Sequence, residues 1–212
     1  MPDLRFSVEG ARAAPSAATP MLELSLRIEN AAGDAVHSAL VTCQVQIDAP
    51  RRRYSAREEA LLKDLFGERA RWGETLRPLA WAQVSLQVPG FTDRTLARLP
   101  LSCSIDVTEG PAKYLFALDE GDVPLTLLFS GTVFHAGPTG ALQVGAIPWN
   151  REARGVVPVE LVRKVAQLHH GGAAFLSLSR EVFDRLHAYR QRRGHPSWEH
   201  AVESLLARAE DS

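Results

Sequence analysis

"VPLTLLFSGTVFHAGPTGALQVGA", residues 123–146, holds the most apolar strand pattern of the chain and the turn that follows it. After the turn at Pro138-Thr139-Gly140, apolar residues alternate with other residues from Leu142 to Ala146. Two such runs joined by a short turn that contains Gly are typical of a β-hairpin. We therefore expect an antiparallel hairpin here. Gly131 stands in mid-strand, where Gly often marks a bulge or a close backbone contact.

The same period of two recurs in six other segments. They are Leu4 to Val8, Leu22 to Ile28, Val41 to Ile47, Leu79 to Val88 before the turn signal Pro89-Gly90, Leu99 to Val107, and the shorter Tyr114 to Phe116. This alternation describes strands with one buried face and one wet face, as in antiparallel sheets. About eight strands with few helices between them predict a two-sheet β-sandwich and not a parallel α/β sheet.

One helix is expected as an insertion between the strands. Residues Ser55-Ala56-Arg57-Glu58 match a capping box, in which the side chains of the first and last residue each bind the other's backbone N–H. Leu61, Leu62 and Leu65 follow at helical spacing, and Gly67 stands where a helix would stop. The sequence therefore predicts a short, well-capped helix in this stretch.

The end of the chain is helical in pattern. Pro148 is expected to end the last strand because it cannot donate to a ladder, and Pro158 is acceptable as a first helical residue. Ser179 and Ser197 are predicted caps of two further helices, the first ending at Gly194. Phe175 to Leu178 could form a short strand.

The complete expectation is an α+β fold. Residues 1–150 form the antiparallel two-sheet β-sandwich of about eight strands, and residues 151–212 form a C-terminal helical segment packed on it. The 212 residues are enough for one well-buried core, so we expect both parts to belong to the same globular unit.

Composition and charge exclude several function classes. The chain is 45% hydrophobic and 23% charged, with a formal net charge of -1, so it has no overall field that would attract nucleic acid or an anionic membrane. The N-terminal sequence MPDLRFSVEG does not resemble a secretory leader, and no stretch reaches 18 apolar residues. We expect a cytoplasmic protein without a membrane span.

Two cysteines, Cys43 and Cys103, lie on apolar faces of alternating segments, 60 residues apart. An inter-sheet disulfide as in immunoglobulin domains is one interpretation, and Trp81 does lie between them. Leu101, however, stands where the tyrosine corner of those domains requires Tyr. In a reducing compartment we favour two buried thiols.

No catalytic constellation is visible. The chain lacks a Gly-x-Ser-x-Gly elbow and a phosphate-binding glycine loop. Its seven histidines include no His-x-x-x-His pair, and His169-His170 are explained as last-turn residues favoured by the helix dipole. We therefore predict no catalytic residue, no metal ligand and no cofactor.

Charged clusters have ordinary explanations as well. The basic runs Arg51-Arg52-Arg53 and Arg190 to His195 could contact phosphates, but we favour a solvated helix end for the second run and expect no nucleic-acid partner. The acidic stretch Asp119-Glu120-Gly121-Asp122 falls short of a calcium loop, and a solvated turn explains it better.

Seven segments of the chain form a distinctive set: Phe129 to Phe134, the Pro138-Thr139-Gly140 turn, Ile147-Pro148-Trp149, Glu152-Ala153, Phe183 to Leu186, Arg193-Gly194 and Trp198-Glu199. Together they resemble an uncharacterised bacterial family that is often encoded beside high-affinity uptake NiFe hydrogenases. The family has no established activity or catalytic residues. The resemblance implies an accessory role with a protein partner, such as a hydrogenase subunit or maturation factor. The two cysteines are too few to hold an iron-sulfur cluster.

The candidate partner-binding residues are Trp149, Arg151, Glu152 and Arg154, which combine an aromatic ring with both charge signs. We favour Trp149 as a buried clamp at the junction of sheet and helices, with an exposed binding anchor as the alternative. The leading hypothesis is thus a non-enzymatic binding or assembly module.

Two other functions stay open. A hydrolase-like or ligand-binding enzyme would use a pocket between sandwich and helices, with His135, Glu152 or His200 as general acid or base. A structural oligomer would pair exposed edge strands.

Overall fold

A computed structural model describes residues 2–14, 17–103, 109–137, 139–170 and 178–210. The chain divides into two compact units, Met1–Gly172 and Ala173–Ser212. The described strands are β1 (Leu4–Ala13), β2 (Met21–Asn30), β3 (Val36–Ile47), β4 (Leu79–Phe91), β5 (Arg94–Ser102), β6 (Asp122–Ala136) and β7 (Leu142–Pro158). The described helices are η1 (Ala49–Arg51), α1 (Ala56–Leu61), α2 (Lys63–Phe66), η2 (Arg69–Arg71), α3 (Trp72–Thr75), α4 (Glu109–Ala117), α5 (Val159–His170), α6 (Arg180–Arg193) and α7 (Trp198–Glu210).

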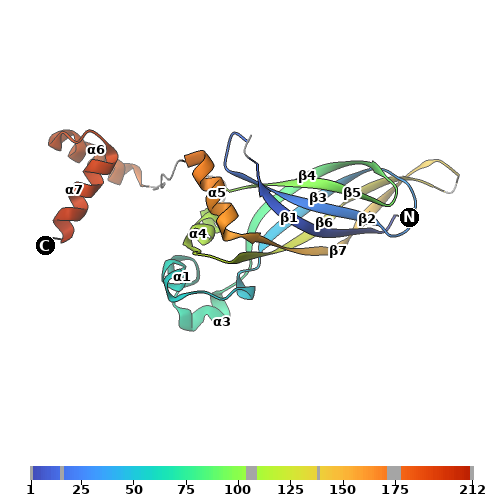
Figure 1. The fold of residues 1–212 in the computed structure, drawn as a ribbon, viewed down its shortest axis with the longest axis horizontal. Coiled ribbons are helices and arrows are strands. Elements are labelled where there is room, and N and C mark those ends of the chain that lie inside the picture. Colours follow the sequence, from blue (N-terminus) through green and yellow to red (C-terminus); the bar gives the residue numbers. More distant parts are fainter. Residues whose placement is uncertain (1, 15–16, 104–108, 138, 171–177, 211–212) are drawn as a thin grey trace. The chain divides into compact units, whose positions relative to one another are not determined.

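The first unit is the predicted antiparallel sandwich. Its strands form two sheets, in the orders β1-β2-β5 and β4-β3-β6-β7, and alternate residues of both sheets fill the core between them. Phe6 stacks on Phe129 across this core, with ring centroids 4.0 Å apart. β1 also contacts β7 and β4 contacts β5, so the two sheets meet along both sides. The helices α1 to α5 gather at one end of the strands (Figure 1).

The predicted hairpin is confirmed, with His135 opposite Gln143 next to its turn. The register of β6 against β7 shifts between Phe129 and Gly131, and Gly131 has a φ of 138°. A Cβ added at Gly131 would lie 2.0 Å from the carbonyl oxygen of Leu40 on β3. Both the bulge and the close backbone contact expected at Gly131 are therefore present.

The expected end of the last strand is wrong, since β7 passes through Pro148 and continues to Pro158. Ile147 pairs with Gly131 and Arg151 with Phe129, so three residues of β7 lie opposite the single residue Ser130. A residue without an N–H is tolerated at such a bulge. The sheet therefore gives way to helix after Pro158 and not after residue 150, and Pro158 ends a strand instead of opening a helix.

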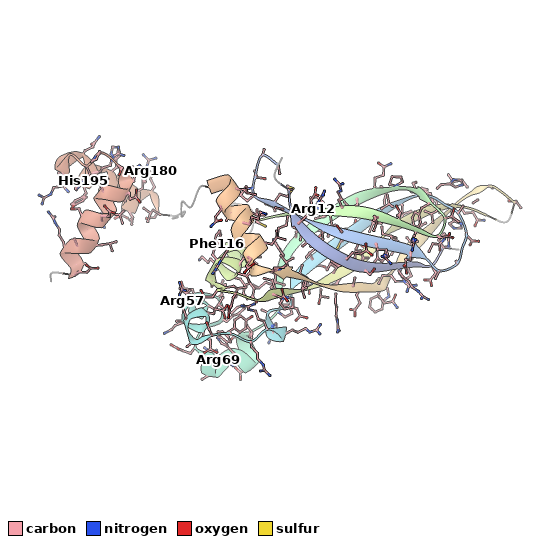
Figure 2. All side chains as sticks on the ribbon, in the orientation of Figure 1. Arg12, Arg57, Arg69, Phe116, Arg180 and His195 are labelled. Carbon is pink, nitrogen blue, oxygen red and sulfur yellow. The ribbon has the colours of Figure 1, made fainter. Side chains whose placement is uncertain are left out.

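Other local expectations also changed. Tyr114 and Phe116 belong to helix α4 and not to a strand. Tyr114 is fully buried, whereas Phe116 is 52% exposed (Figure 2). Two alternate aromatic residues are too few to distinguish a period of two from a helix. β4 continues through Pro89-Gly90 to Phe91. Ile105, Val107 and most of the segment Phe175 to Leu178 lie outside the described residues.

The capping box is confirmed. The Ser55 side chain accepts from the Glu58 backbone N–H, and the Glu58 carboxylate accepts from the Ser55 N–H at 2.8 Å. Gly67 follows the last residue of α2 with a φ of 71°. In place of one inserted helix, the structure has α1, α2, η2 and α3 in succession.

The second unit contains α6 and α7. Ser179 caps α6 and Gly194 ends it in the left-handed conformation, while the Ser197 Oγ accepts from the His200 N–H at 3.2 Å, all as predicted. The guanidinium of Arg190 lies over the Trp198 ring, 4.1 Å from its centroid. No helix among the described residues has the length and apolar character needed to cross a membrane.

Both cysteines are buried free thiols, as we favoured. Burial raises the pKa of Cys43 and of Cys103 to about 12 in each case, from an ordinary 9.0. The fraction of thiolate at pH 8 then falls about 1,000-fold. We expect Ellman's reagent to modify neither thiol within minutes in the folded protein, and both at once in denaturant. Rapid labelling of the folded chain would contradict their burial.

Candidate functional site

The site begins at the bulge of β7. The Trp149 side chain is 88% exposed, so the expectation of a buried clamp is wrong and the alternative, an exposed ring, holds. The bulge separates Trp149 from the regular ladder, in which Ile147 and Ala153 point into the core. A large aromatic ring is thus held in solvent on a hydrogen-bonded strand of the sheet.

Arg151 is part of the scaffold. Its guanidinium forms an ion pair with Asp3, which directly precedes β1, and its Nε is buried without a hydrogen-bond partner among the described residues. Gly155, four residues further on, lets the Val8 side chain of β1 approach to 3.0 Å from where a Cβ would be. β7 is therefore fixed against β1 on both sides of Glu152 and Arg154.

Glu152 and Arg154 are exposed and alternate with buried Ala153. On the neighbouring strand β6, Glu152 is paired with Leu128 and Arg154 with Thr126, both of which are uncharged. Neither forms an ion pair with any other described residue. The structure thus brings Trp149, Glu152 and Arg154 onto one short segment of a fixed strand, and assigns Arg151 the role of its anchor.

The sequence reasoning missed a second feature, the outer face of the four-stranded sheet. β3 and β4 contain no Asp, Glu, Lys or Arg, and the only one in β6 is Asp122 at its first position. The opposite sheet carries the ion pairs Arg12–Glu23 and Arg27–Glu9 on its outer face. The absence of charge from three strand patterns was a visible signal, but only the pairing of the strands shows that they form one surface.

Two of the three residues proposed for an enzyme, His135 and Glu152, do not converge. His135 is buried on β6, whereas Glu152 is exposed on β7 and lies opposite Leu128, seven positions along β6 from His135. His200 belongs to the second unit, where its Nδ1 lies 2.7 Å from the Ser197 Oγ. General acid-base catalysis needs groups within hydrogen-bond reach of one substrate, and His135 and Glu152 do not meet this condition.

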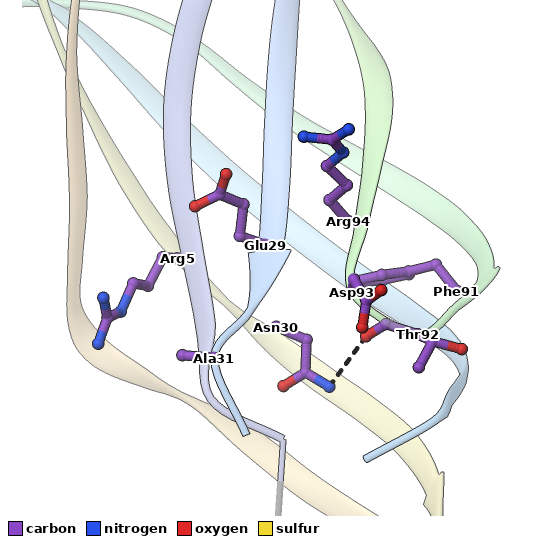
Figure 3. A pocket seen from close by; sticks show the side chains of 8 residues that line it. All are labelled: Arg5, Glu29, Asn30, Ala31, Phe91, Thr92, Asp93 and Arg94. Atoms are coloured by element: carbon purple, nitrogen blue, oxygen red, sulfur yellow. Dashed lines mark hydrogen bonds between the residues drawn. The ribbon is translucent and has the colours of Figure 1, made fainter. Parts of the chain in front are cut away.

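A surface depression of about 770 Å³ lies at the loop end of β2, β4 and β5 (Figure 3). Arg5, Glu29 and Arg94 form one row across three paired strands at its rim. Its most buried polar side chain, Asn30, donates to the carbonyls of Asp34 and Thr92 and accepts from two backbone N–H groups. Every polar atom of that amide is used to connect loops, so it offers nothing to a ligand.

A buried polar cluster joins the inserted helices to the start of β6. The Glu58 carboxylate accepts from Arg52 at 2.6 Å and from the Asp119 N–H at 2.9 Å. Burial by itself raises the pKa of Glu58, but the N–H groups of Ser55 and Asp119 and the Arg52 guanidinium outweigh it and hold the pKa below its usual value. Glu58 is therefore a charged structural group and is poorly suited to accept a proton at neutral pH.

Two tyrosines lie beside this cluster. The Tyr54 and Tyr114 hydroxyls are 2.8 Å apart, and Tyr54 also donates to the Ala49 carbonyl. Burial is the main cause that raises the pKa of both phenols. They remain neutral hydrogen-bonding groups in the packing between η1, the inserted helices and α4.

The acidic stretch after α4 is tied into the same cluster. Asp119 receives a hydrogen bond from Arg57 at 2.8 Å, and the carbonyls of Glu120 and Asp122 accept from Arg52. Within the described part of the chain, no three His, Cys, Asp or Glu side chains are placed so that they could hold a metal ion. The segment therefore fastens elements of the fold.

No curated protein matches this chain. Similar solved structures include a CARDB domain from Pyrococcus furiosus described as a complex with di-metal ions, with 11% identity, 74% of this chain and 92% of that chain covered, and a TM-score of 0.29. Another is a protein described as late embryogenesis abundant, with 10% identity, 74% of this chain and 72% of that chain covered, and a TM-score of 0.34. A third is described as ApaA from Bordetella pertussis, with 15% identity, 74% of this chain and 93% of that chain covered, and a TM-score of 0.27. At these identities and TM-scores, the similarities establish no function for this chain. A family model, in contrast, matches residues 1–212, and the chain therefore belongs to a family of unknown function, DUF6084.

Proposed function

We propose that this protein is a non-enzymatic binding module that contacts a partner protein through the segment Trp149, Glu152 and Arg154. The observation that carries the proposal is the 88% exposure of Trp149. A Trp side chain presents about 150–250 Å² of surface, and leaving it in water gives up the burial that usually stabilises a fold. A partner that covers the ring would recover this free energy.

The surroundings of Trp149 fit a binding hot spot. Aromatic residues and Arg dominate the energy of protein interfaces, where they are surrounded by polar groups that exclude water. Glu152 and Arg154 provide one charge of each sign beside the ring, and no described residue forms an ion pair with either. Because Arg151 and Gly155 hold the strand against β1, little conformational entropy would be lost on binding.

For the identity of the partner, we propose a subunit or maturation factor of an uptake NiFe hydrogenase. The support is the resemblance to a bacterial family often encoded beside such enzymes, and membership of DUF6084 is compatible with it. The proposal places the protein in an accessory role, without a cofactor of its own.

The expected result with Trp149→Ala is a loss of the partner. Removing an anchor of this kind costs about 2 kcal/mol or more, which corresponds to an affinity at least about 30-fold lower. The measurement is affinity purification of the tagged full chain from native cells that express hydrogenase, followed by quantitative mass spectrometry. Leu96→Ala is the matched control, because Leu96 is a 66% exposed apolar residue on the other sheet.

Two results would overturn the proposal. If the wild-type chain retains no protein above the level of an untagged control, the binding module has no partner. If a partner is retained equally by the wild type and by Trp149→Ala, the contact lies elsewhere. Recovery of a partner unrelated to hydrogenase would refute the proposed identity and leave the binding site standing.

A further inference from the structure

The outer face of β4, β3 and β6, together with residues 142–146 of β7, is exposed and wide and carries no Asp, Glu, Lys or Arg apart from Asp122 at the start of β6, a combination that needs an explanation. Directly opposed residues share this face, so Leu40, Phe134 and Val144 lie on it together with Thr42, Gln44 and Ser85. Leu40 is 52% exposed and Val144 is 64% exposed. We call this surface the uncharged face; on β7 it ends before Glu152, which lies in the same row as Gln44 and Leu128 and borders the face.

The solvent-exposed face of a sheet usually carries charged residues, which maintain solubility and prevent association with other sheets. The other sheet of this sandwich follows that rule through Arg12–Glu23 and Arg27–Glu9. Among the described elements of the first unit, those in extensive contact with β3 or β6 are β4, β7 and the short η1, and the exposure of Leu40 and Val144 shows that no helix of this unit covers them. Within that unit the uncharged face is therefore left open.

We propose that the uncharged face is the interface of a homodimer, in which two copies pack this sheet face to face around a two-fold axis. An isologous interface must be complementary to itself. Charged residues oppose this because like charges meet near the axis, whereas hydroxyl and amide groups both donate and accept and can pair with their own kind. The Thr42 and Ser85 hydroxyls, 3.2 Å apart, already pair in this way within one copy.

The size of the face fits a stable dimer. Four strands at about 4.8 Å spacing and about 3.3 Å per residue along the 12 residues of β3 give about 750 Å², and about 700 Å² remain without the part of β7 that carries Glu152 and Arg154. A specific interface buries about 800 Å² on each partner. Sheets pack about 10 Å apart when side chains such as Leu40, Phe134 and Val144 interdigitate. A partner of opposite charge has nothing to recognise here, which favours a second copy.

The test is the mass of the full chain in solution, measured by sedimentation equilibrium between 1 and 100 µM. The wild type is expected at twice the 23.2 kDa of one chain, with no change between low and high salt, because no ion pair contributes. Leu40→Glu, which brings a carboxylate into the interface, is expected to raise the dimer Kd at least about 100-fold. Leu96→Glu, the same change at a 66% exposed position of the other sheet, should remain a dimer.

Circular dichroism melting checks that Leu40→Glu is folded, and Gln44→Lys is a second variant at an exposed position of the same face. A wild type that is monomeric at 100 µM would overturn the proposal. Open-ended assemblies would also overturn it, because they indicate pairing of edge strands. A dimer that persists in both variants would overturn it as well, because the interface would then lie on another surface. Leu40→Glu should leave partner recovery intact and Trp149→Ala should leave the mass unchanged, so the dimer and the proposed function can fail independently.

Discussion

Gly131→Ala is expected to lower the free energy of unfolding by about 4 kcal/mol or more, which is the largest effect we foresee for one methyl group. The added Cβ would lie 2.0 Å from the Leu40 carbonyl oxygen and 3.0 Å from its carbon, both backbone atoms of the neighbouring strand. A side chain cannot rotate to relieve such a contact, so β3 and β6 would have to separate at the centre of the sheet. Chemical denaturation followed by circular dichroism measures the loss.

Gly33→Ala is the matched control for backbone strain. Gly33 has a φ of 75°, but a Cβ at this position would meet no atom within 4 Å. Its expected cost is about 1–2 kcal/mol, the strain of the left-handed conformation alone. Equal effects of the two substitutions would mean that the close contact between Gly131 and Leu40 does not exist in solution.

Glu58→Ala is expected to cost about 3–5 kcal/mol, because it leaves the Arg52 guanidinium buried without its counter-charge. Both side chains of this ion pair are nearly inaccessible, at 9% and 4% exposure. The substitution also removes the acceptor of the Ser55 and Asp119 N–H groups. Urea denaturation at pH 7 measures the loss of stability, with α1 and the start of β6 expected to exchange amide hydrogens first.

Glu59→Gln is the control for charge removal on the same helix. Glu59 forms an ion pair with Arg69 at 2.7 Å, in which Arg69 is 63% exposed. Exposed pairs of this kind contribute at most about 1 kcal/mol. If removing Glu58 were no worse than removing the charge of Glu59, the buried cluster would not be a structural element.

The same carboxylate predicts a dependence of stability on pH. The pKa of Glu58 in the folded protein lies below its usual 4.5, so its stabilising contribution is complete above 4.5 and is lost as the pH falls through the folded value. Glu58→Gln cannot bind or release this proton. The stability difference between the wild type and Glu58→Gln should therefore shrink as the pH falls below 4.5; a difference that stays constant would contradict the lowered pKa.

Local sequence patterns predicted the elements whose cause is itself local. The capping box at Ser55, the helix ends at Gly67 and Gly194, and the hairpin pairing that begins at Ala136 and Leu142 depend on bonds within a few residues, and all are present. The patterns failed where distant contacts decide. Tyr114 packs in a helix against Tyr54, 60 residues away, and a short alternation of aromatic residues could not reveal this.

Candidate site residues show the same division. The combination of Trp149, Glu152 and Arg154 could be identified from residue types, but burial of the ring was the favoured prediction and is wrong. From the sequence, Pro148 predicts the end of a strand because proline cannot donate to a ladder. In the structure, Pro148 lies in a bulge of β7 opposite Ser130, where no N–H donor is needed. Such a bulge depends on how β7 pairs with β6, which the sequence of β7 alone does not reveal.

The amino-acid sequence by itself determined that this protein is an antiparallel sandwich with helices, because alternation with period two shows which side chains must leave water wherever one face of a strand is buried. Only the tertiary structure decided which strands are neighbours. That pairing places three uncharged strand patterns side by side as one surface, sets Gly131 against Leu40, and leaves Trp149 in solvent. The physical reason is that strand order and register are fixed by contacts between residues far apart in the chain, which no local period encodes.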